Sequence, residues 1–164
     1  MVVSDSVVRN VRADHADMKV ECFPGVKTKQ LHRVLEKRDL VSPETLIIHV
    51  GANDLRTTRN LDFVMGEVYV LVSTAKKKLP NCRLVLSGEL RCRDVSWWRI
   101  GALNDRFNWV ANALGLTFVD PNNWMEGDFA RDGLHLNGRG KGRLGQLYGR
   151  VSGLDVGGSA ERNM

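Results

Sequence analysis

The stretch TLIIHVGAND, residues 45–54, decides the fold of this chain. Its first six residues are largely apolar or β-branched, and they run directly into Gly51. A short continuous apolar run that stops at a glycine is typical of a strand buried on both faces of a sheet. The sequence therefore predicts a central strand over 45–50, with the polar residues Asn53 and Asp54 standing just beyond its carboxyl end.

Short apolar runs alternate with helix-period segments along the rest of the chain. The remaining expected strands cover residues 2–3, 18–23, 82–86 and 117–119, and the expected helices cover 27–38, 60–79, 96–114 and 144–151. Gly115 suits the carboxyl end of the third of these helices. Strands that alternate with helices predict an α/β domain whose mostly parallel sheet is covered on both faces.

Composition fits one globular domain. The chain has 164 residues, of which 43% are hydrophobic and 26% are charged, as in ordinary soluble proteins. We expect one domain over 1–155 and a flexible tail over 156–164. The three cysteines form no CxxC pair, which argues against a disulfide framework or a zinc site and favours reduced thiols in the cytoplasm.

The basic charge balance has two interpretations. The formal net charge is +5, which could attract nucleic acid or anionic lipid, or could be dispersed charge that serves solubility. The basic, glycine-rich stretch RGKGRLGQLYGR, residues 139–150, could likewise contact phosphates or form a solvated helix face.

Ligands of open parallel sheets bind beyond the carboxyl ends of the strands. In this chain those positions are residues 5–6, 25, 51–54, 87–89 and 120–135. Side chains that are able to carry out catalysis gather there, so we expect the functional site at this edge of the sheet.

Ser6 follows the first expected strand at the start of an expected helix. Its hydroxyl would meet the helix N-terminus, whose free N–H groups favour a developing negative charge. The residues alone leave open a second interpretation, in which Ser6 and Asp5 only cap that helix, since both types are preferred N-caps.

Asp132 and His135 have Asp-x-x-His spacing. A serine hydroxyl is a weak nucleophile until a base takes its proton, and an aspartate in the same turn could fix the tautomer of that base. The spacing is also compatible with an ordinary surface turn.

Asn53 and Gly25 are candidate oxyanion donors. The Asn53 amide could donate into the crevice, and Gly25 could bring a backbone N–H to the same point because it has no side chain. Together with the Ser6 N–H they would make a three-donor oxyanion hole. The alternative for residues 51–54 is a turn followed by a helix cap.

The remaining distinctive residues are expected to be structural. We interpret His15 as a loop residue, His32 as a helix-face residue and His49 as a satisfied core histidine. Because carboxylates and histidines do not cluster at ligand spacing, we expect no metal and no cofactor. The adjacent Trp97 and Trp98 could line an acyl pocket, contact a membrane or stack on bases, but we expect at least one to pack in the core.

These motifs together resemble one known family. In chain order the sequence contains Ser4-Asp5-Ser6, Gly25, Gly51-x-Asn53-Asp54 and Asp132-x-x-His135. The pattern resembles the SGNH, or GDSL-type, hydrolase superfamily, whose four marker residues are Ser, Gly, Asn and His. The resemblance spans residues 4–135, and it departs from the family at Ser4, where a glycine is usual.

The resemblance implies a three-layer α/β/α fold with a five-stranded, mostly parallel sheet and a metal-free serine esterase or lipase. By it, Ser6 is the nucleophile, His135 the base and Asp132 the residue that orients His135. The N–H groups of Ser6 and Gly25 and the Asn53 amide would bind the oxyanion. Register favours Ser6 over Ser4 as the nucleophile, although a serine at position 4 could strain the turn or slow turnover.

A closer resemblance is carried by SDSVVRNV at 4–11, IIHVGANDLR at 47–56 and DGLHLNGRGKGRLGQLY at 132–148. These segments are similar to the esterase domain in the first open-reading-frame protein of vertebrate, notably fish, LINE-type non-LTR retrotransposons. That resemblance implies an acyl or lipid ester substrate, with a membrane surface and, in a longer natural chain, RNA as further partners. The alternative is a nucleic-acid-associated or membrane-binding module with a hydrolase fold and little catalysis, and the oligomeric state stays open.

Overall fold

A computed structural model describes residues 1–5, 18–39, 43–124 and 136–153 of the chain. Its centre is a five-stranded sheet in the order β2-β1-β3-β4-β5, in which every neighbouring pair is parallel. The strands are β1 Val2–Ser4, β2 Val20–Cys22, β3 Thr45–His49, β4 Arg83–Ser87 and β5 Thr117–Val119. Each lies within one residue or two of a predicted strand, and β3 is buried along its whole length, as its apolar run predicts.

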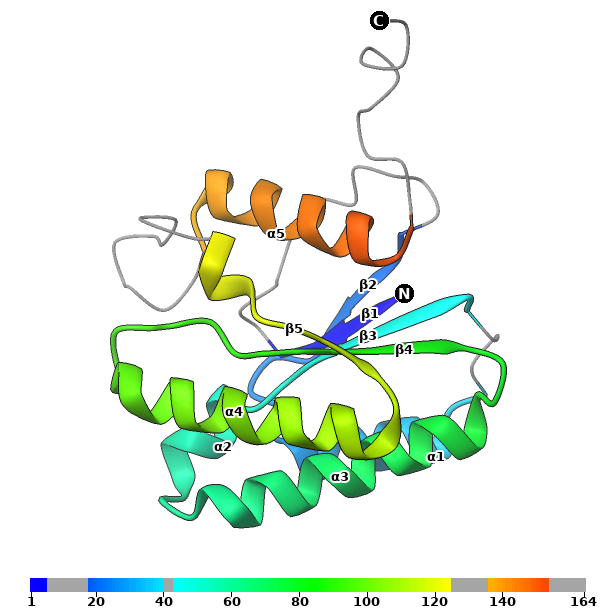
Figure 1. The fold of residues 1–164 in the computed structure, drawn as a ribbon, viewed down its shortest axis with the longest axis horizontal. Coiled ribbons are helices and arrows are strands. Elements are labelled where there is room, and N and C mark those ends of the chain that lie inside the picture. The colour runs from blue at the N-terminus through cyan, green and yellow to red at the C-terminus, as the bar shows by residue number, and fades with distance from the viewer. Residues whose placement is uncertain (6–17, 40–42, 125–135, 154–164) are drawn as a thin grey trace, which may run out of the picture.

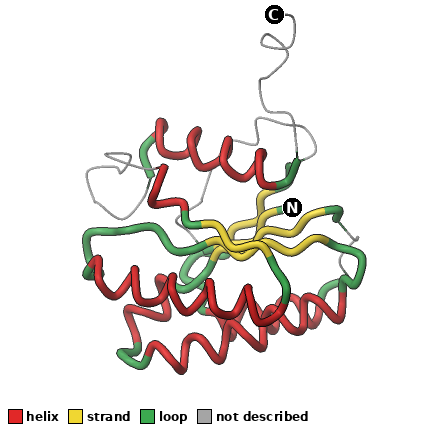
Figure 2. The backbone as a smooth tube through the Cα atoms, viewed as in Figure 1, coloured by secondary structure: helices red, strands yellow, loops and turns green. Residues whose placement is uncertain are grey.

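The helices form the two outer layers (Figures 1 and 2). Four of them cover one face of the sheet and α5 covers the other, which gives the expected three-layer α/β/α arrangement. Their bounds are α1 Thr28–Lys37, α2 Ala52–Thr57, α3 Leu61–Lys78, α4 Trp97–Leu114 and α5 Gly138–Val151, with a 3-10 turn at Pro121–Trp124. The predicted end of α4 is confirmed, because Gly115 adopts the left-handed conformation with φ of 73°.

Alternate residues of the strands supply two separate cores. Leu46 and Ile48 of β3 belong to the larger core beneath α1, α3 and α4. Ile47 points to the opposite face and packs with Leu144 and Tyr148 of α5. This two-sided burial keeps the strands in register and places their carboxyl ends side by side.

Two elements differ from the sequence-based expectation. Helix α5 begins at Gly138, six residues before the predicted start, because the Asn137 side chain accepts a hydrogen bond from the Gly140 N–H at 2.9 Å and caps the helix. Gly140 is buried within it, so this glycine packs inside the protein instead of forming a loop. The short helix α2 was not among the helices expected, although one interpretation of residues 51–54 was a turn followed by a helix cap.

Candidate active site

The serine at position 4 is part of the sheet. Ser4 ends β1 and is completely buried. Its hydroxyl donates to the Asp5 backbone carbonyl at 2.8 Å and lies 3.7 Å from the Cys22 sulfur. A buried hydroxyl that is already bonded to the backbone argues against Ser4 as the nucleophile.

The structure brings the two predicted oxyanion turns together. The Asn53 amide nitrogen donates to the Val26 carbonyl at 3.0 Å, which places the start of α2 against the turn after β2. The Arg56 guanidinium donates to the side-chain amide oxygen of Asn53, Oδ1, at 3.0 Å. Both ends of the amide are therefore held, and the bond to Val26 uses one of its two N–H hydrogens. Asn53, at the start of α2, and Gly25, in the turn after β2, therefore lie in adjoining segments.

The backbone conformation at residue 25 favours glycine. Its φ is 73°, and a Cβ added there would meet none of the described residues within 4 Å. The left-handed conformation, which costs other L-residues about 1–2 kcal/mol, is the constraint that the described part of the chain places on this position.

Asp54 also ties α2 to the start of α1, which follows the turn after β2. Its carboxylate accepts hydrogen bonds from the Thr28 backbone N–H at 3.0 Å and from the Thr28 hydroxyl at 2.8 Å. Burial raises the pKa of Asp54 above its ordinary value, while the bonds from Thr28 act against that shift. Asp54 thus caps α1 across the gap between the turns, which is a structural role and not a catalytic one.

A buried cluster of charged groups lies beside these turns. Asp5, His49 and Glu89 each offer a polar atom, and these atoms lie within 4.8 Å of one another. The His49 Nε2 atom is 3.2 Å from a Glu89 carboxylate oxygen, and both side chains are completely buried. On the other side of the ring, Nδ1 lies 3.0 Å from the Tyr148 hydroxyl and 3.2 Å from that of Ser87.

The charged groups in this cluster shift one another's pKa values toward the ionised forms. Burial alone would lower the pKa of His49, but the carboxylates of Glu89 and Asp5 outweigh it and raise the pKa to about 9. Burial would likewise raise the pKa of Glu89, but the His49 cation and the Ala52 N–H hold it below its ordinary value. These opposite shifts favour an imidazolium paired with a carboxylate.

Sequence reasoning missed this cluster. His49 is the buried histidine expected from its strand. The absence of ligand spacing along the sequence did not reveal that two carboxylates lie beside it. The three residues lie at or just beyond the ends of three different strands and are far apart in the chain, so no local spacing indicates them. The same group of ligand-type atoms would suit a metal ion, but the carboxylate–imidazolium pairing already explains it, and we assign a charge-paired cluster.

The tryptophan pair contradicts the expectation that one member packs in the core. Trp97 is 67% exposed and Trp98 is 72% exposed. The buried stripe of α4 begins only at Ile100, so both tryptophans stand at the solvent-facing start of the helix. The Arg91 guanidinium lies 4.8 Å above the Trp97 ring and covers part of it.

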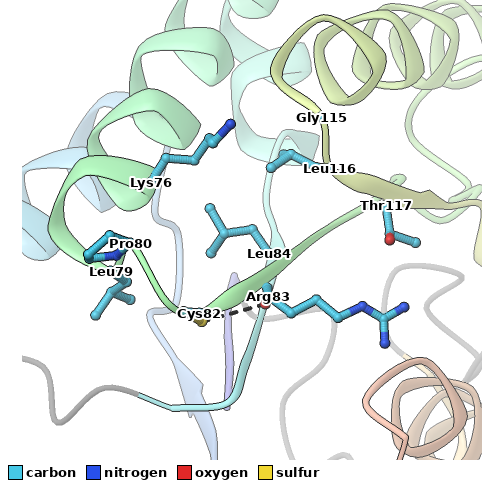
Figure 3. A pocket seen from close by; sticks show the side chains of 9 residues that line it. All are labelled: Lys76, Leu79, Pro80, Cys82, Arg83, Leu84, Gly115, Leu116 and Thr117. Atoms are coloured by element: carbon cyan, nitrogen blue, oxygen red, sulfur yellow. Dashed lines mark hydrogen bonds between the residues drawn. The ribbon is translucent and has the colours of Figure 1, made fainter.

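A separate cavity of about 310 Å³ lies at the opposite edge of the sheet. Figure 3 shows the residues around it, among them Arg83 at the start of β4 and Thr117 at the start of β5. In parallel sheets that edge is not the ligand-binding one, and we do not assign the cavity to the candidate site.

The predicted triad members Ser6, Asp132 and His135 lie outside the described residues. The described residues nearest to them in the chain are Asp5, which follows β1, and Leu136, which precedes α5. Within the described part of the chain, no helix combines the length and the apolar character that crossing a membrane requires.

Comparison with known proteins identifies the class. The chain matches the GDSL-like lipase/acylhydrolase family over residues 5–143, and it belongs to this family. The family places it among the carboxylic ester hydrolases. A search of curated protein sequences found no match.

Solved structures show the same fold. A GDSL-like lipase from Bacteroides thetaiotaomicron is 21% identical, with a TM-score of 0.77 over 93% of this chain and 86% of that one. A carbohydrate acetylesterase from Sinorhizobium meliloti is 14% identical, with a TM-score of 0.74 over 93% and 97%. A family 3 carbohydrate esterase from Clostridium thermocellum is 17% identical, with a TM-score of 0.74 over 92% of each chain.

Proposed function

We propose that this protein is a serine esterase that hydrolyses short-chain acyl or lipid esters through Ser6, His135 and Asp132. His135 takes the Ser6 proton as the hydroxyl attacks the acyl carbonyl, and Asp132 fixes the imidazole tautomer. The alcohol leaves with the proton from His135, and water activated by the same histidine then releases the acid.

The oxyanion of each tetrahedral intermediate would be held by the N–H groups of Ser6 and Gly25 and by the Asn53 amide. The observation that carries this assignment is the doubly anchored Asn53 amide beside the Gly25 turn. A donor that is fixed before the reaction stabilises developing charge without any cost of reorganisation. The buried position of Ser4 adds support, because it disfavours one of the two serines in Ser4-Asp5-Ser6.

Two substrate classes fit this site. Structures of similar fold include carbohydrate esterases, which suggests acetyl esters. The exposed Trp97 and Trp98 at the strand-end edge suggest longer acyl chains, since indole rings offer apolar surface with a polar edge. We propose short acyl chains as the first choice, and longer lipid esters as the alternative.

The cellular setting is a separate proposal, supported by the sequence resemblance of residues 47–56 and 132–148 to retrotransposon esterase domains. In that setting the esterase would belong to a longer cytoplasmic protein that associates with RNA. Salt-sensitive RNA binding by the longer protein, with weaker binding by this domain alone, would support it. Equal RNA binding by both would favour the binding-module alternative instead.

Hydrolysis of p-nitrophenyl esters of graded chain length tests the proposed activity. Turnover should vanish in Ser6→Ala and His135→Ala and persist in the matched controls Ser4→Ala and His32→Ala. The rate should fall as pH drops below about 6.5, because His135 must be neutral to act as the base. Turnover that survives in Ser6→Ala would reject the proposal.

A further inference from the structure

We propose that the buried Asp5–His49–Glu89 cluster is a positioning device for the esterase reaction, in which His49, paired with Glu89, holds Asp5, the residue before Ser6, and the start of α2, which carries Asn53, at a fixed separation. This inference rests on the proposed function, because it assigns the cluster a role in that same site. No member of the cluster is proposed to touch the substrate.

The first link joins the nucleophile turn to the central strand. Asp5 is the residue before Ser6, and its backbone N–H donates to the His49 carbonyl at 3.3 Å. The adjoining pair Ser4 and His49 is in register between β1 and β3. The Asp5 carboxylate also lies within 4.8 Å of a His49 ring nitrogen, so both the backbone and the side chain of Asp5 lie against His49.

The second link joins the cluster to the oxyanion turn. One Glu89 oxygen accepts the Ala52 N–H at 3.0 Å, while the other faces His49 at 3.2 Å. Ala52 is the residue before Asn53. A single carboxylate therefore connects the histidine to the backbone that carries the Asn53 amide.

The third link closes the hydrogen-bond chain on the other side of the ring. With both ring nitrogens protonated, Nδ1–H donates to Tyr148, the Tyr148 hydroxyl donates to Ser87 at 2.9 Å, and Ser87 donates to the Gly88 carbonyl at 3.4 Å. Each hydrogen on the Nδ1 side of the ring then has an acceptor, while Nε2 faces the Glu89 carboxylate as an ion pair. A neutral His49 would leave the buried Glu89 carboxylate without its cation, which is a costly arrangement inside a protein.

His49 is the member of this cluster that titrates in the alkaline range. The groups that face it are Asp5 from β1, Ser87 and Glu89 from the end of β4, and Tyr148 from α5. Burial raises the pKa of Tyr148 far above its ordinary value, and the pKa of Glu89 is lowered. Loss of the His49 proton near pH 9 should therefore loosen both turns and lower kcat.

The test is the pH dependence of kcat and KM for a p-nitrophenyl ester, measured with the wild type, Glu89→Gln, His49→Gln and the control His32→Gln. Glu89→Gln retains an oxygen for the Ala52 N–H and removes only the charge, so it guards against simple misfolding. His32 lies on α1 and bonds to Thr74 at 2.8 Å, away from the cluster.

We expect the wild type and the His32→Gln control to lose kcat above about pH 9. Glu89→Gln should shift this alkaline limb to lower pH, and His49→Gln should remove it. At neutral pH both cluster variants should lose kcat roughly 10- to 100-fold with little change in KM, as expected for reacting groups that are slightly misplaced. NMR of the histidine ring nitrogens should show His49 as an imidazolium at neutral pH in the wild type.

A neutral His49 at that pH, a stoichiometric metal ion in the purified protein, or an alkaline limb that is unchanged in both variants would overturn the positioning role. Absence of any turnover in the wild type would reject the proposed function, and the positioning role with it. Turnover that Ser6→Ala abolishes, together with an unchanged alkaline limb, would reject the positioning role alone.

Discussion

The Asn53 amide nitrogen lies 3.0 Å from the Val26 carbonyl oxygen, and this bond helps to join the start of α2, just after β3, to the turn after β2. The strands β2 and β3 are not neighbours, because β1 lies between them in the sheet. The bond therefore links segments that follow the two strands on either side of β1, the strand that precedes the proposed nucleophile Ser6 in the chain.

Replacing Asn53 by alanine should lower kcat by about 10²–10³, which is the usual cost of losing one oxyanion donor. KM should change little, because the amide acts on the transition state. Steady-state kinetics with a short-chain p-nitrophenyl ester measures this effect. Asn108 is exposed on α4, and Asn108→Ala should keep wild-type turnover; equal kcat in both variants would remove Asn53 from the site.

Gly25→Ala should destabilise the protein by about 1 kcal/mol, because alanine must adopt the left-handed conformation there. Gly66 provides the matched control, since it lies within α3 with open space around it. Gly66→Ala should stabilise the protein by about 0.5–1 kcal/mol. Chemical denaturation measures both changes, and a stabilising Gly25→Ala would contradict the turn conformation.

Stability should fall as the pH becomes alkaline. The pKa of His49 in the folded protein is about 9, above its ordinary value of 6.5, so its ion pair stabilises the fold fully below pH 6.5 and is lost as pH rises through about 9. The linked loss is up to about 3 kcal/mol.

Denaturant titrations at neutral and alkaline pH measure this loss. It should shrink in His49→Gln and stay unchanged in His32→Gln. A loss of equal size in both variants would mean that another group is responsible.

The two exposed tryptophans should contribute little to stability. Trp98→Ala should change the free energy of unfolding by no more than about 0.5 kcal/mol, as is usual for surface positions. Phe107 lies on the same helix but is completely buried, and Phe107→Ala should cost about 3–5 kcal/mol. Thermal or chemical unfolding distinguishes the two, and a large cost at Trp98 would show that this ring is covered.

The strands and most helices were predictable because their signals are local. The run at 45–50 and the glycine after it locate β3, and Gly115 marks the end of α4. Helix α5 was placed too late because its first turns are rich in glycine, the weakest helix former apart from proline. Its early start depends on the Asn137 cap and on packing against the sheet.

The candidate site was predictable only in part. Gly25 and Asn53 follow strands, and parallel topology brings the ends of strands together, so their proximity could be foreseen. The Asp5–His49–Glu89 cluster could not, because its members become neighbours only when side chains from three strand ends turn inward. The exposure of Trp97 and Trp98 also depends on where α4 starts relative to the core, which hydrophobicity alone does not indicate.

The most direct test of the central claim is to label the protein with a fluorophosphonate, which forms a covalent adduct with an activated serine, and to locate the adduct by fragmentation mass spectrometry. The account predicts one adduct, on Ser6, which forms in Ser4→Ala and is lost in His135→Ala. An adduct on Ser4, or no adduct on a protein that still hydrolyses esters, would contradict it.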